Sequence, residues 1–351
     1  MIRLIQKIFN KLNQNILKIL TDFLLLLLNK LGINEIFRLI NRKKISILMY
    51  HGIIEDDSYP VHRTDVIKSN FENHLKYLIK KNYTFITLTQ LFEIIKYKKK
   101  IKQRYVILTF DDGFKNIIEI AYPLIKRYKA KGCIFVVSSI IGNNKLLWTD
   151  YLNFILTTYN KSEFQFYFKN QKILYYINSK KELINTYGDI KNKLRSLNNI
   201  ELNLHLKQFE TIFDIENYKN ISYNYLIANW EELKAFDQNY IEIACHTRTH
   251  PNLVNLKTEK EFYDELFVSK KEIENFIGYP INHLSYPAGS YNKKVIYYSK
   301  KFGFLTGTTI NEGLNTKNTD LLQLKRIKVD NNSILFKYKI SGLYYYIKKF
   351  I

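Results

Sequence analysis

From Lys44 onward, the chain alternates short runs rich in β-branched and aromatic residues with stretches that have the spacing of amphipathic helices. This alternation restricts the fold more than any other feature, because it is typical of βα units built around a parallel sheet or barrel. We expect strands at 45–50, 83–86, 105–110, 133–137, 240–245, 283–286, 304–307 and 324–328. We expect helices between them, at 69–81, 115–128, 259–277 and 293–302. The chain is therefore predicted to belong to the α/β class.

Two parts of the chain depart from this pattern. Between about residues 142 and 227 the segment is polar, rich in Asn and Lys and mostly helical in pattern, so we interpret it as an insertion between two strands. Residues 331–351 combine Lys with Tyr and Phe and predict a basic, aromatic helical tail. The expected organisation is an N-terminal amphipathic helical segment (1–43), an α/β domain (44–330) that carries the insertion, and the tail.

The charge balance points to an anionic neighbour. Lys and Arg number 54 against 32 Asp and Glu, a formal net charge of +22. Such a charge favours nucleic acid, anionic lipid or acidic glycans as neighbours, although a base-composition bias in the coding sequence is an equal explanation.

Only two cysteines occur, Cys133 and Cys245. Both lie in apolar runs, so we expect two reduced core thiols and no disulfide framework.

The N-terminal forty residues are rich in Leu and Ile with interspersed basic residues, but their longest uninterrupted apolar run is 23–28. A spanning helix needs about 20 mostly apolar residues, and Lys18, Asp22 and Lys30 interrupt the candidate segment. The segment also lacks the small-residue cleavage site of a signal peptide. We expect a helix that either lies on an anionic membrane surface or packs on the domain itself. The expected location is cytoplasmic, with peripheral contact at the inner membrane; export or a periplasmic location is the alternative.

Two adjacent carboxylates, Asp111 and Asp112, follow the strand expected at 105–110 and precede Gly113. The C-terminal ends of parallel strands are where active sites assemble in α/β folds. Neighbouring carboxylates repel each other unless a cation or a proton intervenes. The pair therefore indicates a metal or a catalytic proton, with an exposed Asp-Asp-Gly turn as the alternative.

Two histidines four residues apart, His246 and His250, follow the strand expected at 240–245. Imidazole is a preferred Zn ligand, and two histidines with one carboxylate from another strand make a three-ligand site with open positions, as expected of a catalytic metal.

A third strand, 283–286, runs into Pro287-Ala288-Gly289. This tight turn either aims backbone N–H groups at a developing oxyanion or is an ordinary loop.

Together these segments resemble the polysaccharide deacetylases of the NodB-homology type, carbohydrate esterase family 4. The segment 109–113 (TFDDG) is similar to the first motif of the family, 246–250 (HTRTH) to the second, and 286–289 (YPAG) to the third in the form seen in poly-N-acetylglucosamine deacetylases. The resemblance covers roughly 45–330 apart from the insertion. It implies a distorted (β/α) barrel, a bound divalent metal that is usually Zn, and removal of acetyl groups from N-acetylated sugars.

Carried over by position, the resemblance implies that Asp112, His246 and His250 bind the metal and that Asp111 is the general base. The metal would polarise the acetamide carbonyl and activate its bound water, whose proton Asp111 would take. A backbone N–H near Ala288 would hold the tetrahedral oxyanion. Metal identity stays open, because two histidines and one Asp accommodate Zn, Co, Ni or Fe.

The chain departs from the family pattern at two points. The usual C-terminal Leu-x-His is absent, since no histidine follows His283. The segment 47–52 (ILMYHG) is similar to the Tyr-His segment of poly-N-acetylglucosamine deacetylases, whose histidine is the proposed general acid. We therefore expect His51 either to act as the general acid or to shape the site. Ser285 also stands where the family often has an Arg that orients the catalytic Asp. We hypothesise that Arg326 replaces that Arg from the last strand, with a plain surface Arg as the alternative.

These features predict a metal-dependent deacetylase that acts on an N-acetylated sugar of a surface polysaccharide or its lipid-linked precursor. An inactive glycan-binding relative is one alternative, which the intact set of Asp and His residues argues against. A nucleic-acid-binding protein is another, suggested by the net charge. The chain has no basic or aromatic cluster in one motif that would recognise phosphates, so no nucleic acid partner is expected.

Overall fold

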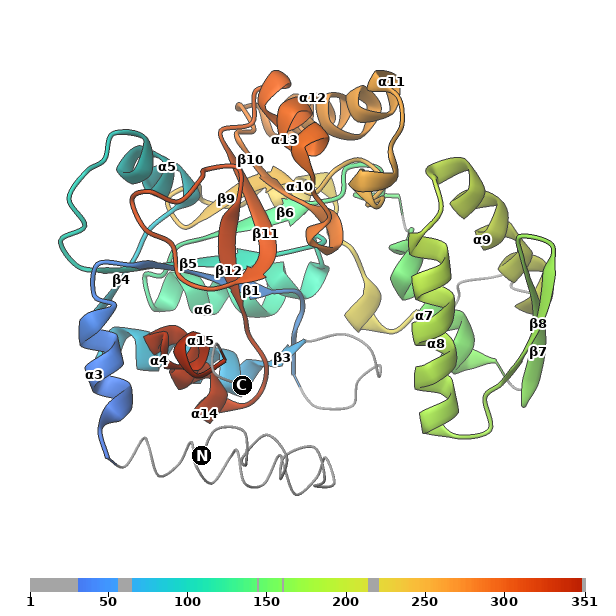
Figure 1. Cartoon of the computed structure of the whole chain (residues 1–351), viewed down its shortest axis with the longest axis horizontal. Helices are drawn as coiled ribbons and strands as arrows, with labels where there is room; N and C mark the ends of the chain where they lie inside the picture. The colour runs from blue at the N-terminus through green and yellow to red at the C-terminus, as the bar shows by residue number, and fades with distance from the viewer. Residues whose placement is uncertain (1–30, 56–64, 144, 160, 214–220, 349–351) are drawn as a thin grey trace, which may run out of the picture.

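The structure, a computed structural model, describes residues 31–348 apart from 56–64, 144, 160 and 214–220. Seven parallel strands close into a barrel, which confirms the expected (β/α) architecture (Figure 1). Around the barrel the strands are β1 (Ile45–Tyr50), β12 (Leu324–Lys328), β11 (Thr306–Glu312), β10 (His283–Ser285), β9 (Ile241–Cys245), β6 (Gly132–Val136) and β5 (Arg104–Phe110). The barrel closes because β5 pairs with β1. An eighth strand, β4 (Tyr83–Phe85), joins the outer side of β5.

Strand residues alternate between two apolar cores. Ile45 and Ile47 of β1 belong to a cluster that includes Ile107 of β5 and fills the barrel interior. Leu48 and Tyr50 belong to the larger cluster between the strands and the surrounding helices. Every residue of β1 is buried, as expected of a parallel strand covered on both faces. The outer helices are α4 (Lys68–Lys80), α5 (Leu88–Lys96), α6 (Tyr122–Arg127), α10 (Trp230–Lys234), α11 (Glu259–Phe262), α12 (Ser269–Ile277) and α13 (Lys293–Lys301).

The insertion forms a lobe with its own apolar core, drawn in green beside the barrel in Figure 1. It contains α7 (Trp148–Thr158), β7 (Glu163–Phe168), β8 (Gln171–Tyr176), α8 (Lys180–Arg195) and α9 (Asn199–Phe213). The expected helical pattern describes α7, α8 and α9, but the antiparallel hairpin β7–β8 was not expected. The hairpin forms because β7 alternates buried and exposed residues, with Phe164 and Phe166 facing the lobe's core.

The C-terminal helices α14 (Ser333–Ser341) and α15 (Leu343–Ile347) pack against the outside of the barrel beside α3 (Ile33–Ile40) (Figure 1). The ring of Phe336 stacks on His74 of α4 at 3.9 Å, and the Tyr83 hydroxyl donates to the Ile340 carbonyl at 3.2 Å. Residues 1–30, most of the expected N-terminal helical segment, lie outside the described residues. None of the helices that are described has both the length and the apolar character needed to cross a bilayer.

Candidate active site

Strand register decides which side chains reach the mouth of the barrel. Ile47 and Ile107 fill the interior, and side chains alternate along a strand. His51 and Asp111, four residues later in each case, therefore face the mouth. A cavity of about 840 Å³ opens there, beyond the C-terminal ends of the strands. Its lining includes every candidate residue expected from the sequence: His51, Asp111, Asp112, His246, His250, Ala288 and Arg326.

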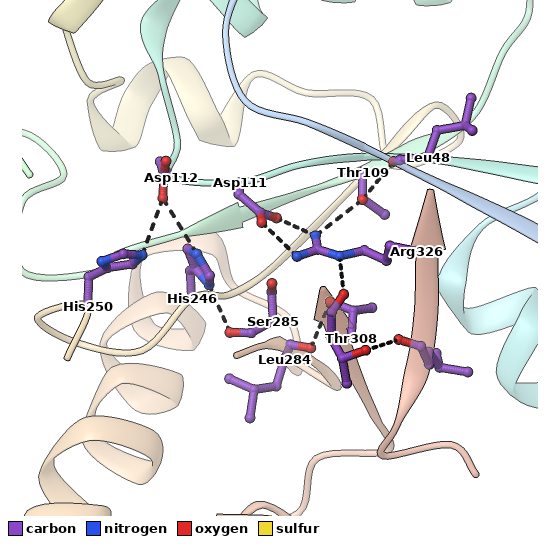
Figure 2. Close-up of polar contacts among 12 residues, drawn as sticks. Leu48, Thr109, Asp111, Asp112, His246, His250, Leu284, Ser285, Thr308 and Arg326 are labelled. Carbon is purple, nitrogen blue, oxygen red and sulfur yellow. Dashed lines mark hydrogen bonds and ion pairs between the residues drawn. The ribbon is translucent and has the colours of Figure 1, made fainter. Parts of the chain in front are cut away.

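Asp111 is held by a bidentate ion pair. Nη1 and Nη2 of Arg326 donate to its two carboxylate oxygens at 2.7 and 2.8 Å, in the fork geometry that a guanidinium makes with a carboxylate (Figure 2). Nε of Arg326 donates to the Thr309 carbonyl at 2.9 Å, so β11 fixes the guanidinium plane. Burial is the largest single influence and opposes ionisation of Asp111, but the charge and the hydrogen bonds of Arg326, with contributions from neighbouring groups, together outweigh it and hold the pKa of the carboxyl well below its usual range. Asp111 is therefore ionised at every physiological pH.

Asp112, His246 and His250 form the one cluster of potential metal ligands among the described residues, with their donor atoms within 4.8 Å of one another. Oδ1 of Asp112 lies 3.5 Å from Nε2 of His246 and 3.7 Å from Nε2 of His250 (Figure 2). The Nδ1–H of His246 donates to the Ser285 carbonyl at 2.8 Å, which leaves Nε2 as the lone-pair donor. Burial lowers the pKa of His246 to about 4 and the pKa of His250 well below its usual value, so both imidazoles are neutral. Two neutral imidazoles and one carboxylate facing a common point fit a divalent metal.

The backbone at this site is strained. Asp112, Thr247, His250 and Ala288 have φ angles of 80°, 66°, 60° and 51°, a region that side-chain-bearing residues rarely adopt. Such strain persists only where the surroundings enforce it, and it clusters at functional sites.

A buried carboxylate, Glu265, enforces the conformation of the histidine loop. It accepts from the backbone N–H groups of Arg248 and Thr249 at 3.1 and 2.9 Å and from Nδ2 of Asn199 at 2.8 Å. Glu265 lies in the π-helical segment Tyr263–Val268 between α11 and α12 and is 3% exposed. Sequence analysis did not identify Glu265, because it lies in an ordinary amphipathic helix pattern.

The loop after β1 places His51 at the cavity. Gly52 N–H donates to Oδ1 of buried Asp65 at 2.9 Å, and Ile53 N–H donates to Oδ1 of buried Asn116 at 3.2 Å. A Cβ at Gly52 would lie 2.8 Å from Oδ1 of Asp65, so only glycine fits here. Two buried polar side chains therefore fix the backbone next to His51.

The amino-acid sequence that builds this site matches a family of known proteins. The family described as polysaccharide deacetylase matches residues 98–194 and 206–307, more than half of the chain. The chain belongs to the polysaccharide deacetylase family. It is accordingly a sugar N-deacetylase, and the resemblance found in its motifs is confirmed.

Several known proteins are similar to this deacetylase, two of them in sequence and two in fold. YxkH of Bacillus subtilis is 23% identical over 286 residues, 82% of this chain and 71% of its own length. The poly-beta-1,6-N-acetyl-D-glucosamine N-deacetylase of Staphylococcus aureus is 38% identical over 79 residues, 22% of this chain and 26% of its own length. Among solved structures, Streptococcus pyogenes deacetylase PplD in complex with acetate has a TM-score of 0.54 at 18% identity, covering 83% of this chain and 94% of that one. IcaB from Ammonifex degensii has a TM-score of 0.56 at 15% identity, with coverages of 86% and 97%.

The other histidines that the structure describes do not line the cavity. His74 packs between Tyr50 and Phe336, and the His283 ring bonds to Thr89 and Thr306. Nδ1 of His205 donates to the Glu201 carbonyl at 2.7 Å within α9. His62 lies outside the described residues.

Much of the cavity wall of the deacetylase comes from residues that sequence analysis did not single out. The insertion supplies Thr149, Asp150, Tyr187, Lys191 and Arg195, and the C-terminal helices supply Tyr345 and Lys348. One signal was available: Tyr187, Lys191 and Arg195 follow one another at intervals of four, so they share one face of a helix. Which way that face points depends on how the insertion packs on the barrel, and local sequence does not show this.

Proposed function

We propose that the protein removes the N-acetyl group from an N-acetylated hexosamine of a surface polysaccharide or its precursor. The observation that carries the proposal is the juxtaposition, in one cavity, of the Asp112–His246–His250 cluster with the Asp111–Arg326 ion pair. The Staphylococcus aureus relative is named for a polymer of N-acetylglucosamine, which makes that sugar the first to test.

The donor set of Asp112, His246 and His250 is suited to Zn²⁺ or another divalent cation of similar preference. Bound there, the cation supplies Lewis acidity that polarises an acetamide carbonyl and lowers the pKa of water. The chain contributes the orientation of the donors: Ser285 fixes the ring of His246, and Glu265 fixes the loop that carries His250. Trp148 of the insertion adds a bond from its indole Nε1 to the His250 carbonyl at 3.4 Å.

Asp111 is proposed to accept the proton of the attacking water. Its carboxylate is ionised and already oriented by Arg326, so no reorganisation precedes the proton transfer. The backbone N–H of Ala288, in the turn closed by Gly289 N–H on the Tyr286 carbonyl at 2.8 Å, is proposed to stabilise the oxyanion. His51 is proposed to protonate the departing amine, since it lines the same cavity and an imidazole titrates near neutrality.

The test is acetate release from oligomers of N-acetylglucosamine by chelator-stripped protein, Zn-restored protein and Zn-restored Asp111→Asn. The proposal expects release only after Zn is restored, and a loss of at least about a hundredfold in kcat for the variant, as is typical of removing a general base. A Zn titration of Asp111→Asn is the control, because the variant keeps the three proposed ligands. Release that does not depend on metal, or that survives in Asp111→Asn, would contradict the proposal.

The location that we propose is a membrane surface. The net charge of +22 favours anionic lipid, which fits an enzyme acting on a lipid-linked precursor from the cytoplasmic side. Flotation with vesicles of phosphatidylglycerol, compared with vesicles of phosphatidylcholine, tests this. Binding to neither kind of vesicle would leave soluble precursor or exported polymer as the substrate pool.

A further inference from the structure

The outer wall of the active-site cavity is basic. Lys191 and Arg195 of α8 and Lys328 at the end of β12 all line it, and Lys348 after α15 lies on the same wall. The spacing of Lys191 and Arg195 places them on one helical face. Nζ of Lys191 lies 4.6 Å from the centre of the Tyr187 ring, a contact that holds the ammonium group at the cavity.

The carboxylates of the cavity form no ion pair with Lys191, Arg195 or Lys328 in the described part of the chain, although Glu312 lies near Lys348. Asp111 is paired with Arg326, Asp112 belongs to the proposed metal site, and Glu312 lies 3.4 Å from Nζ of Lys339 and 3.6 Å from Nζ of Lys348. The fourth, Asp150, is buried in the first turn of α7.

Three cations of the wall have no carboxylate partner within the described part of the chain: Lys191, Arg195 and Lys328 form no ion pair there. They also repel one another. Burial lowers the pKa of Lys191, and the charges of Arg195 and Lys328 lower it further. Like charges gathered without counter-charges in a half-enclosed space favour binding of an anion.

Hydrogen bonds connect Arg195 to the loop that carries His250. The Arg195 carbonyl accepts from Nδ2 of Asn252 at 3.1 Å and from Nδ2 of Asn255 at 2.8 Å, both in the segment that follows His250. The C-terminal end of α8 is therefore tied to the loop that carries a proposed metal ligand. Arg195 also lines the same cavity as Asp112, His246 and His250, so a group that it binds is expected to lie on the acetylated sugar or on a neighbouring one.

We propose that the substrate is an anionic glycan, and that Lys191, Arg195 and Lys328 bind a phosphate or carboxylate group on the acetylated sugar or its neighbour. This inference rests on the proposed function and narrows it, because an uncharged homopolymer of N-acetylglucosamine would leave these three cations without a counter-charge. Lys and Arg side chains bind both anions, as a point charge and as a bidentate fork respectively.

The experiment compares three substrates with the full-length, Zn-loaded protein: the N-acetylglucosamine tetramer, the tetramer with a 6-phosphate on one sugar, and the tetramer with one C6 oxidised to a carboxylate. The readout is the ratio of kcat/KM for acetate release from a charged tetramer to that from the neutral one. We expect a ratio above about ten, since hydrogen bonds to charged groups are worth that factor or more. The charged tetramer with the higher ratio identifies the anion. A ratio of one or less for both would overturn the proposal.

Lys191→Met, Arg195→Met and Lys328→Met test the assignment of the residues. Each is expected to lower the ratio by about tenfold. Lys181→Met is the matched control, because Lys181 is exposed on the same helix and does not line the cavity. Structural damage would lower kcat/KM for charged and neutral substrates together and leave the ratio unchanged, which would overturn the assignment.

Failure of the proposed function has a different signature, namely no acetate from any tetramer. In that case calorimetric titration of the same tetramers measures the anion site directly. Binding of a charged tetramer at least about tenfold tighter than the neutral one, weakened by Lys191→Met, would support the anion site without the reaction. Equal binding would refute it.

Discussion

The Asp111–Arg326 pair joins the proposed general base to the side chain that orients it. Arg326 is 1% exposed and Asp111 is 3% exposed, so neither charge has water to stabilise it if the other is removed. The pair is costly to break for that reason. Its value for the proposed reaction is that a carboxylate held at both oxygens keeps one position and stays ionised.

Arg326→Met should alter both stability and the pH dependence of the reaction. We expect a loss of roughly 3–5 kcal/mol in the free energy of unfolding, as for other broken buried pairs. Burial without the counter-charge raises the pKa of Asp111, so the acidic limb of the kcat/KM profile should move to higher pH. Arg127→Met is the control, because Arg127 is 70% exposed and lies 3.7 Å from Glu72 at the surface. A pH profile that stays in place in the folded Arg326 variant would refute the orienting role.

Glu265→Gln should weaken metal binding without removing a ligand. Oε2 of Glu265 accepts from the backbone N–H groups of Arg248 and Thr249, and Oε1 accepts from Nδ2 of Asn199 and from the Thr249 hydroxyl, so the amide nitrogen of Gln faces a donor in either orientation. We expect Zn affinity to fall about tenfold, the lower end of the effect of supporting residues around a metal. Competition with a chromogenic chelator measures it. Glu261→Gln, which alters a similar carboxylate at the start of α11, should leave the affinity unchanged.

At the scale of elements, the insertion is part of the active site. Asn199 of α9 donates to Glu265, Trp148 of α7 donates to the His250 carbonyl, and Asn252 and Asn255 hold the end of α8. These contacts join the insertion to the histidine loop from three of its helices. Movement of the insertion would therefore change both the cavity wall and the support of the proposed metal site.

Asn255→Ala should affect substrate binding more than chemistry. Nδ2 of Asn255 donates to the carbonyls of Arg195 and Leu197, so its loss frees the C-terminal end of α8. We expect KM to rise about fivefold, corresponding to roughly 1 kcal/mol for a lost hydrogen bond, with kcat and Zn affinity nearly unchanged. Steady-state kinetics with a chelator titration measures all three. A fall in kcat with KM constant would show that the bond supports the reaction centre instead.

How far the sequence predicts these elements depends on where their signals lie. β12 was expected at 324–328 and occurs there, with Leu324, Arg326 and Ile327 buried. β11 was expected at 304–307 but spans Thr306–Glu312, since its second half ends in polar residues that face the cavity rather than the core. Asp111, Asp112, His246 and His250 follow strands directly, so their meeting at one end of the barrel is predictable. Lys191 and Arg195 reach the cavity only through packing between the insertion and the barrel, which no local pattern encodes.

At the scale of the whole molecule, a buried histidine should make stability depend on pH. His74 of α4 lies in the core between Tyr50 and Phe336, and burial lowers its pKa to about 3 from an ordinary value near 6.5. The unfolded chain binds a proton between these two values and the folded chain does not, so stability falls as the pH drops below 6.5.

We expect His74 alone to remove about 2 kcal/mol from the free energy of unfolding between pH 7 and pH 5. His74→Phe keeps an aromatic ring against Phe336 but cannot titrate, so its stability should fall less over that range. Urea unfolding at both pH values gives the two differences. His74→Phe removes the hydrogen-bond partner of the Tyr50 hydroxyl, so the variant should be less stable at both pH values. This loss cancels, because only the difference between the two pH values is compared. Equal pH dependence in the two proteins would show that other groups account for it.

The closure of the barrel has a consequence for biosynthesis. β1 pairs with both β5 and β12, and β12 carries the residue that lies 215 positions after Asp111 in the chain. While the polypeptide emerges from the ribosome, the early strands form one side of an open sheet whose buried carboxylate has no guanidinium beside it. Contacts between such distant segments form late. The enzyme should therefore be unable to act on any glycan until its last strand has left the exit tunnel, and a nascent chain stalled before Arg326 should be both inactive and prone to bind chaperones.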